Sequence, residues 1–551
     1  MKEQIIKLTI CLVLIFTASS FADSFFEDFE STPNGSMPAG WNVYDYDSGD
    51  ASVVFGVTDS FASTNVATSK RAMVTTSDSP YDLCYYNGNS ADGVPATSWK
   101  NYSVSAVINY DGSYWSSTQD WCGLVGRLQP STGNAIGCRF KGKGDGSEEL
   151  FIYTLINNNG SFQQIRLGTL VTDFDDKQDW IITLNVFDND DISATQVWAT
   201  AVPVDESQDP LLVSCAIAYD DTRFAAAGLT NGGCAGAIFY HGSTRKMNFD
   251  DFTVNFEKPE IMPRLVGHFQ SDTSSYLGHA YWSIADPTNM YSWYTEIDSQ
   301  DYVTSVADGV FNKALNVCSE FTDPNTTGAL FEGSDEHYDD YENGVRTTAF
   351  WWKPNFAKPT VTSSVEIWSW DTYVVTYNYD ASTGKDYLTF TIPTSSGDET
   401  VSTVAAVDAV DFADYNFVAS SWFNNRASYS ASADAIGIKL NDAAQVVETL
   451  TGQIVDETNR FFGIYNGIFD EMVIMPIFMD DNDLEQARTR TTEFAPDSTP
   501  IDCADAIDVY GPMPYDLDGN CYIGTGDLTI MASQWLNCIN PGDSNCDTPW
   551  L

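Results

Sequence analysis

Short stretches in which apolar and polar residues alternate recur along most of the chain. Tyr102 to Ile108 has apolar residues at every second position with serines between the first three, and Phe252 to Phe256 repeats the pattern. A period of two places alternate side chains on opposite faces of a β-strand. Leu150 to Ile156 and Trp180 to Phe187 are more continuously apolar, as expected for strands covered on both faces. Many short strands at this spacing predict β-sandwiches and argue against a helical or α/β fold.

The clearest local element is a predicted hairpin. Apolar and aromatic residues alternate from Tyr373 to Tyr379, a polar turn follows at Asp380 to Gly384, and alternation resumes from Leu388 to Ile392. Two alternating runs joined by a short turn that contains glycine are typical of adjacent antiparallel strands. We therefore expect paired strands on the two sides of this turn.

The first residues predict export. Two lysines precede an apolar run from Ile10 to Thr17, and small residues lie just before Asp23. This order is typical of a signal peptide, which we place at residues 1–22. The run is too short to span a bilayer, and no other stretch approaches the ~20 apolar residues that a membrane helix needs. We expect a secreted, extracellular protein without membrane insertion.

The balance of charge narrows the range of partners. The chain carries 77 Asp and Glu against 26 Lys and Arg, a formal net charge of −51. Such a charge repels nucleic acid and anionic membrane surfaces, whereas cations and neutral ligands stay compatible with it. The acidity either keeps a large secreted protein soluble or forms an acidic binding surface, and we favour solubility.

Two polar, proline-containing segments divide the mature chain. They lie at residues 258–263 and 489–501, and both are predicted linkers. A chain of 551 residues is long enough for more than one domain. We expect β-domains at residues 23–257 and 264–488 and a small module at 502–551.

One loop near the end of the chain has a specific chemical pattern. Side-chain oxygens stand at its positions 1, 3, 5 and 12, and a backbone carbonyl is available at position 7. A short loop wraps a hard cation such as Ca2+ with this spacing of oxygens. The alternative interpretation is a turn that is merely rich in Asp and Asn. The predicted calcium ligands are Asp516, Asp518, Asn520, the carbonyl of Tyr522, and Asp527.

A short helix is expected after this loop. Leu528, Met531, Ala532 and Trp535 fall on one face of a helix of about ten residues. Four cysteines crowd the same module, which is too small to bury a large core and gains most from disulfides in an oxidising compartment. The pairing of these disulfide candidates is left open; they are Cys503, Cys521, Cys538 and Cys546.

Both β-regions resemble known jelly rolls. The first resembles a concanavalin A-like jelly roll through Phe26 to Glu30, Pro38 to Trp41, Gly123 to Arg127 and Asn248 to Val254. The second resembles a laminin-G-like jelly roll through five stretches that occur in the order typical of that family, at residues 265–269, 301–303, 310–317, 348–354 and 467–474. The resemblance implies a mainly β protein with two jelly-roll β-sandwiches in tandem.

Residues 503–546 resemble half of a dockerin, the calcium-loop and helix module that docks secreted proteins onto a cohesin-like partner. The resemblance implies a small α-helical, EF-hand-like module with Ca2+ as its cofactor and attachment to a scaffold or cell surface. The chain departs from the family in two ways. Cys521 stands where such loops carry glycine, and one loop is present where dockerins carry two.

No stretch identifies a catalytic site. Glu296 and Asp298 share one face of an expected strand and are similar to the paired carboxylates of laminarinase-type glycoside hydrolases. Asp301 replaces the glutamate expected there, so we favour a solvated strand face. The four histidines lack metalloprotease spacing, and no nucleophile elbow or phosphate loop occurs.

Aromatic residues give the remaining indication of function. Eight of them lie in or beside polar, turn-rich stretches, where exposed rings could stack on sugars, although rings are also the usual core of β-sandwiches. They are Tyr114, Trp115, Trp121, Tyr281, Trp282, Tyr291, Trp293 and Tyr294. We expect a secreted, non-catalytic protein that binds carbohydrate or another extracellular ligand. The alternatives are a polysaccharide-active hydrolase or lyase and a structural adhesion protein.

Overall fold

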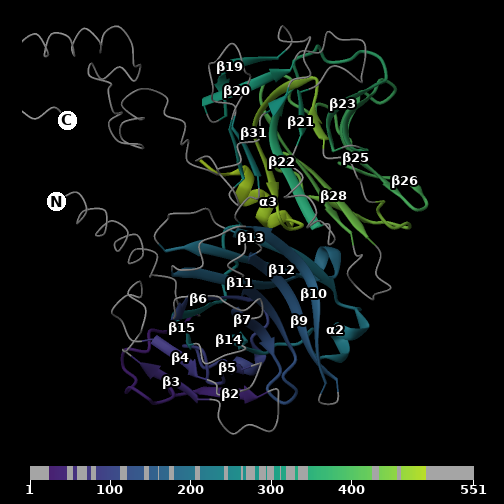
Figure 1. The fold of residues 1–551 in the computed structure, drawn as a ribbon. Coiled ribbons are helices and arrows are strands. Elements are labelled where there is room, and N and C mark those ends of the chain that lie inside the picture. The colour runs from purple at the N-terminus through teal and green to yellow at the C-terminus, as the bar shows by residue number, and fades with distance from the viewer. Residues whose placement is uncertain are drawn as a thin grey trace, which may run out of the picture.

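The structure, a computed structural model, contains two β-sandwiches stacked one on the other (Figure 1). The fold is mainly β and built from several antiparallel sheets, as predicted, and these sheets are consistent with jelly-roll sandwiches. Among the described residues, no helix is long and apolar enough to cross a membrane. The structure describes residues 24–45, 54–58, 71–75, 82–111, 121–141, 148–158, 161–172, 179–204, 211–240, 246–261, 265–268, 280–283, 293–294, 303–310, 312–317, 329–332, 345–370, 372–424, 434–455 and 461–491.

In its described ranges, the first sandwich consists of two sheets and three short helical segments. Sheet 1 has the strand order β13 (Leu211–Ala218), β12 (Ala194–Pro203), β11 (Trp180–Asn189), β6 (Tyr102–Asp111), β15 (Lys246–Asn255), β4 (Arg71–Thr75) and β3 (Val54–Thr58), with β1 (Phe25–Glu27) beside β15. Sheet 2 has the order β10 (Ser161–Thr172), β9 (Glu148–Asn158), β8 (Ala135–Lys141), β7 (Trp121–Leu128), β14 (Cys234–Tyr240), β5 (Asp82–Tyr86) and β2 (Trp41–Asp45). The helical segments are η2 (Ala96–Ser98), η3 (Asp190–Ile192) and α2 (Thr222–Ala226).

The core of the first sandwich lies between sheets 1 and 2. The predicted alternation in β6 is confirmed, because Tyr102, Val104, Ala106 and Ile108 are all buried on its inner face. From the facing strands, the rings of Trp180 in β11 and Phe140 in β8 meet with their centroids 5.2 Å apart. Large aromatic contacts between the two inner faces stabilise the stack of sheets.

Arg127 connects strand β7 of sheet 2 to sheet 1. Its guanidinium is fully buried and donates to Asp188 Oδ1 at 2.8 Å and to Thr195 Oγ1 at 3.0 Å. Burial alone would raise the pKa of Asp188, but Arg127 and Lys100 outweigh burial and hold that pKa below its ordinary value. The ion pair is therefore a buried structural anchor between the sheets.

The second sandwich also consists of two sheets. Sheet 3 has the order β17 (Ala280–Ser283), β16 (Leu265–His268), β31 (Gly467–Met475), β22 (Val345–Lys353), β27 (Asn416–Phe423), β28 (Ala435–Leu440) and β29 (Val446–Thr449), and β20 (Asn312–Val317) joins β31 to β19 (Val303–Gly309). Sheet 4 has the order β18 (Trp293–Tyr294), β21 (Ala329–Glu332), β30 (Phe461–Ile464), β23 (Ser363–Trp370), β24 (Tyr373–Asp380), β25 (Lys385–Thr394) and β26 (Gly397–Ser402). Helix α3 (Asp481–Arg488) follows β31.

The predicted hairpin is present as β24 and β25. The two strands pair antiparallel, with Tyr377 opposite Leu388, around a turn in which Gly384 has a φ of 66°. Glycine adopts this left-handed backbone without the steric cost that a side chain brings. The alternating residues point inward, and Tyr373, Val375 and Tyr377 are buried in the core of the second sandwich.

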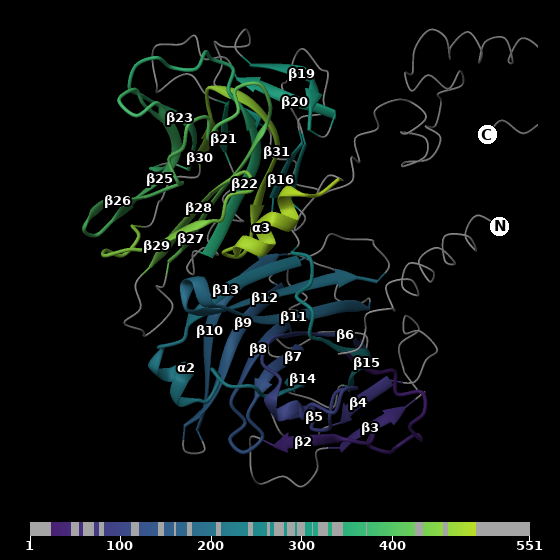
Figure 2. The same ribbon diagram turned by 180° about the vertical axis from the view of Figure 1, so that it is seen from behind.

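The two sandwiches meet along an apolar seam between the outer faces of sheets 1 and 3 (Figure 2). Phe187, Trp198 and Leu212 of the first sandwich form one buried cluster with strands β22, β27 and β31 and with helix α3 of the second. A second cluster joins Ala194 and Ala216 to residues of β22, β27 and β28. Both clusters remove apolar surface from water, which favours a fixed arrangement of the sandwiches.

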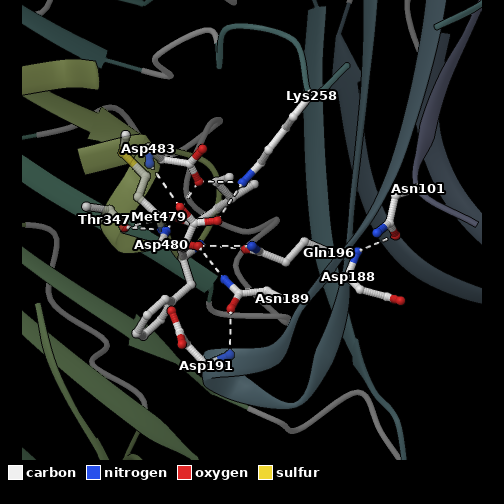
Figure 3. Close-up of polar contacts among 12 residues, drawn as sticks. Asn101, Asp188, Asn189, Asp191, Gln196, Lys258, Thr347, Met479, Asp480 and Asp483 are labelled. Carbon is white, nitrogen blue, oxygen red and sulfur yellow. Dashed lines mark hydrogen bonds and ion pairs between the residues drawn. The ribbon is translucent and has the colours of Figure 1, made fainter. Parts of the chain in front are cut away.

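Polar contacts at the seam hold the segment between β31 and α3 (Figure 3). The side chain of Gln196 hydrogen-bonds both the N–H and the carbonyl of Phe478. The Asn189 amide donates to the same carbonyl at 3.0 Å. On the other side of the segment, Thr347 accepts from Met479 N at 2.9 Å and donates to Ile477 O at 3.0 Å. The segment is thus held between strands of both sandwiches.

The described part of the first predicted linker, residues 258–261, packs into this seam. Ile261 is buried in the apolar cluster. Lys258 forms ion pairs with Asp480 at 3.3 Å and with Asp483, two residues of the capping box that starts α3. This stretch therefore acts as a fixed connection rather than a loose spacer.

Candidate functional site

The outer face of sheet 4 is the broad face of the second sandwich that does not lie in the seam, and a β-bulge shapes it. In β23, Glu366 pairs with Thr376 of β24 and Trp368 pairs with Val375, so Ile367 is the extra residue. Residues three positions apart normally lie on opposite faces of a strand. The bulge reverses that relationship and places Glu366 and Ser369 together on the outer face.

Tyr465 completes this cluster from the chain that follows β30. Gly463 lies opposite Ser369 in the sheet. A Cβ added at Gly463 would lie only 2.2 Å from the Tyr465 hydroxyl oxygen and 2.5 Å from Cζ. The phenol ring therefore crosses the sheet over a position that only glycine leaves open. Its backbone N–H donates to Ile367 O at 2.9 Å, and Ser369 Oγ donates to its hydroxyl at 3.1 Å.

Burial adjusts the protonation of both acidic groups in this cluster. Burial raises the pKa of Glu366, and a hydrogen bond with Ser369 opposes part of that change. The pKa of Tyr465 is raised by burial first and by the charge of Glu366 in addition, against the effect of the Ser369 hydrogen bond. The phenol therefore stays protonated and can donate or accept a hydrogen bond.

Polar side chains continue from the cluster across the neighbouring strands. Thr391 of β25 and Thr400 of β26 share a hydrogen bond of 2.8 Å. Asn378 of β24 donates to Thr389 of β25 at 3.0 Å. We call the set the polar face of sheet 4; its members are at least partly exposed except Ser369, and they are Ser364, Glu366, Ser369, Thr376, Asn378, Thr389, Thr391, Thr400, Ser402 and Tyr465.

This arrangement suits binding better than bond cleavage. A partly exposed ring beside hydroxyl and carboxyl groups offers one surface for stacking and several groups for hydrogen bonding. Two-carboxylate glycosidases need their acids within about 9.5 Å of each other. Among the described side chains of this face, the other carboxylates lie roughly 13 Å or more from Glu366, because Asp380 is four residues along β24 from Thr376, the partner of Glu366, and Asp398 is three strands away on β26. The raised pKa of Tyr465 also disfavours it as a base.

The predicted calcium site lies outside the described residues. The same holds for the candidate disulfides and for the carboxylates Glu296 and Asp298. In the described ranges, no group of His, Cys, Asp and Glu is arranged to hold a metal ion. Of the eight aromatic residues, Trp121, Tyr281, Trp282, Trp293 and Tyr294 lie on strands, with only their backbone described.

The cysteines of the first sandwich are structural. Burial raises the pKa of the Cys138 thiol and that of the Cys234 thiol, each to about 12. A thiol that resists ionisation and is shielded from solvent is a poor nucleophile. The described cysteines are buried thiols; they are Cys84, Cys122, Cys138, Cys215 and Cys234.

Sequence reasoning did not identify the cluster of Glu366, Ser369 and Tyr465. One local signal was present, since the consecutive apolar residues Ile367 and Trp368 break the alternation of β23 in the manner of a bulge. Strand β23 pairs with β30, which lies about a hundred residues further along the chain. The residue pattern of either strand alone does not predict this pairing.

No family model and no curated protein matches the chain. Solved structures that match at low identity include lectins, glycoside hydrolases, a lyase and a CBM2 module of a phage protein. An alginate lyase from Aplysia kurodai is 12% identical over 39% of this chain and 90% of its own, with a TM-score of 0.25. The VIP36 exoplasmic/lumenal domain is 10% identical over 43% and 92%, with a TM-score of 0.25. The family 131 glycoside hydrolase catalytic domain from Coprinopsis cinerea is 10% identical over 42% and 93%, again at 0.25. Similarity at this level assigns neither ligand nor reaction to this chain.

Proposed function

We propose that this is a secreted carbohydrate-binding protein that holds its ligand on the polar face of sheet 4. The observation that carries the proposal is the Tyr465 ring, held over Gly463 beside Ser369 and Glu366. Sugar rings present apolar C–H faces and a rim of hydroxyl groups. An aromatic ring next to hydrogen-bonding groups matches both parts of such a ligand.

The rest of the face extends this match. Thr376 on β24 and Thr389 and Thr391 on β25 add hydroxyl groups, and Asn378 on β24 adds an amide. Neighbouring strands are about 4.8 Å apart, so the groups from β23 to β26 span roughly 14 Å. That length suits several units of a glycan chain lying across the strands.

The tail has its own role in this proposal. The loop with Asp516, Asp518, Asn520, Tyr522 and Asp527 binds Ca2+ and folds the terminal module, which docks the protein onto a cohesin-like or surface partner. Support for this role comes from the oxygen spacing of the loop and from its resemblance to half of a dockerin. The signal peptide at residues 1–22 delivers the protein to the cell exterior.

Binding and turnover measured together test the ligand-binding half. The full mature chain is titrated by calorimetry with soluble oligosaccharides of several backbone types, and reducing-sugar release is followed on the same sugars. We expect binding without release, and Tyr465→Ala should weaken it about 3- to 10-fold through the lost ring contact. The matched control, Tyr219→Ala in the first sandwich, should leave affinity unchanged. Release of sugar would instead favour a hydrolase.

A further inference from the structure

The charges on the polar face of sheet 4 are uneven. The described charged side chains that face outward are Glu366 on β23, Asp398 on β26, and Asp380 and Lys385 at the end of the β24–β25 hairpin. Asp380 and Lys385 lie opposite each other, and Asp380 is four residues along β24 from Thr376, which pairs with Glu366. β24 contributes Thr376 and Asn378 but no charge to the middle of the face.

Cations elsewhere in the second sandwich are already engaged. Lys358 pairs with Asp386 at 2.9 Å and with Asp408 at 2.6 Å. Lys439, on β28 of sheet 3, pairs with Asp481 at 2.7 Å. The described cation of this face, Lys385, lies at the hairpin end, so an anionic ligand group near Glu366 would meet a carboxylate with no described cation beside it.

We propose that this face selects neutral glycans and rejects glycans that carry uronic acids. The proposal rests on the function proposed above and specifies its ligand class. A uronate brought to Glu366 would lose water and gain only like-charge repulsion. The net charge of −51 adds repulsion at longer range. Neutral hydroxyl groups avoid both costs, and they can donate to Glu366 or accept from the Tyr465 hydroxyl.

A panel of short, soluble oligosaccharides tests the selection. The full mature chain is titrated with neutral β-glucan, xylan and mannan oligosaccharides and with oligogalacturonate and oligoalginate, at low and physiological salt. We expect at least one neutral oligosaccharide to bind and both uronates to bind at least about tenfold more weakly, with a larger gap at low salt. Equal or tighter binding of a uronate at the same face overturns the selection and leaves the proposed function standing. No binding of any sugar overturns the proposed function and the selection with it.

Charge reversal at Glu366 tests whether this residue causes the weaker binding of uronates. Glu366→Lys should strengthen uronate binding at least about tenfold, because it supplies the missing cation. Glu448→Lys on β29 of sheet 3 makes the same change in net charge on another sheet and should have no such effect. If both variants gain the same affinity for uronates, the selection against uronates comes from overall charge, and a role of Glu366 is refuted. Glu366→Gln guards against misfolding of the lysine variant, and it should narrow the gap between neutral and uronate ligands while it preserves side-chain shape.

Discussion

Gln196 of the first sandwich pairs with both backbone groups of Phe478 in the second. Its Nε2 donates to Phe478 O at 2.9 Å, and Phe478 N donates to its Oε1 at 2.7 Å. Gln196 is 1% exposed and Phe478 is fully buried. A buried amide in this geometry serves as a surrogate strand partner for a segment that lies between two sheets. The seam is therefore specific as well as apolar.

The first prediction concerns this pair. Gln196→Ala leaves the buried N–H of Phe478 without its acceptor, while Asn189 still donates to the carbonyl. We expect the free energy of unfolding to fall by about 1–3 kcal/mol, measured by chemical denaturation. Thr400→Ala, which removes an exposed hydroxyl on β26, is the control and should cost well under about 1 kcal/mol. Equal losses of unfolding free energy in the two variants would show that the Gln196–Phe478 hydrogen bonds do not stabilise the seam.

The second prediction concerns the glycine under the Tyr465 ring. Gly463→Ala brings a methyl group to within 2.2 Å of the Tyr465 hydroxyl, so the ring must move. We expect a loss of about 1–3 kcal/mol in unfolding free energy together with weaker glycan binding. The same substitution in a Tyr465→Ala background should cost much less, because the ring is absent. If the cost is the same in both backgrounds, the ring does not depend on Gly463.

The strands themselves were largely predictable, because local alternation fixes them. β6 and the β24–β25 hairpin follow directly from periods of two in residues 102–108 and 373–392. What alternation cannot tell is which face meets solvent. Ser103 is polar and yet 7% exposed, since it lies on the face of sheet 1 near the seam and donates to Asn185 at 2.7 Å. A polar residue in a strand therefore did not mark a solvent face here.

The candidate site was not predictable for a related reason. Glu366 and Ser369 come together through a bulge, and Tyr465 joins them through pairing between β23 and β30. Both are properties of the folded sheet, and neither strand alone encodes them. The aromatic residues selected from their polar surroundings did not include Tyr465, because its position over glycine depends on that pairing.

The third prediction is a pH dependence at the seam. The pKa of Asp191 is raised by burial first and then by the charges of Asp480, Asp190 and Asp481. A raised folded-state pKa means that the charged form is disfavoured in the fold, so this contribution to stability improves as pH falls through that pKa. Asp191→Asn should therefore raise the Tm at pH 7 slightly, and the gain should vanish below the ordinary Asp value of about 3.9. Scanning calorimetry from pH 3 to 8 checks this, and a gain that does not change with pH would refute it.

The last prediction concerns Ca2+ and the tail. If Asp516 and Asp527 ligate the ion, calorimetry on the full mature chain should give one calcium site, and Asp527→Ala should abolish it, since position 12 closes the loop. Chelator should lower the melting transition of the terminal module only, because the described sandwiches hold no metal-ligating cluster. Asp505→Ala lies in the same module but outside the loop and is the matched control. Calcium heat that survives Asp527→Ala would place the ion elsewhere, and no heat in the unaltered chain would remove calcium from the function.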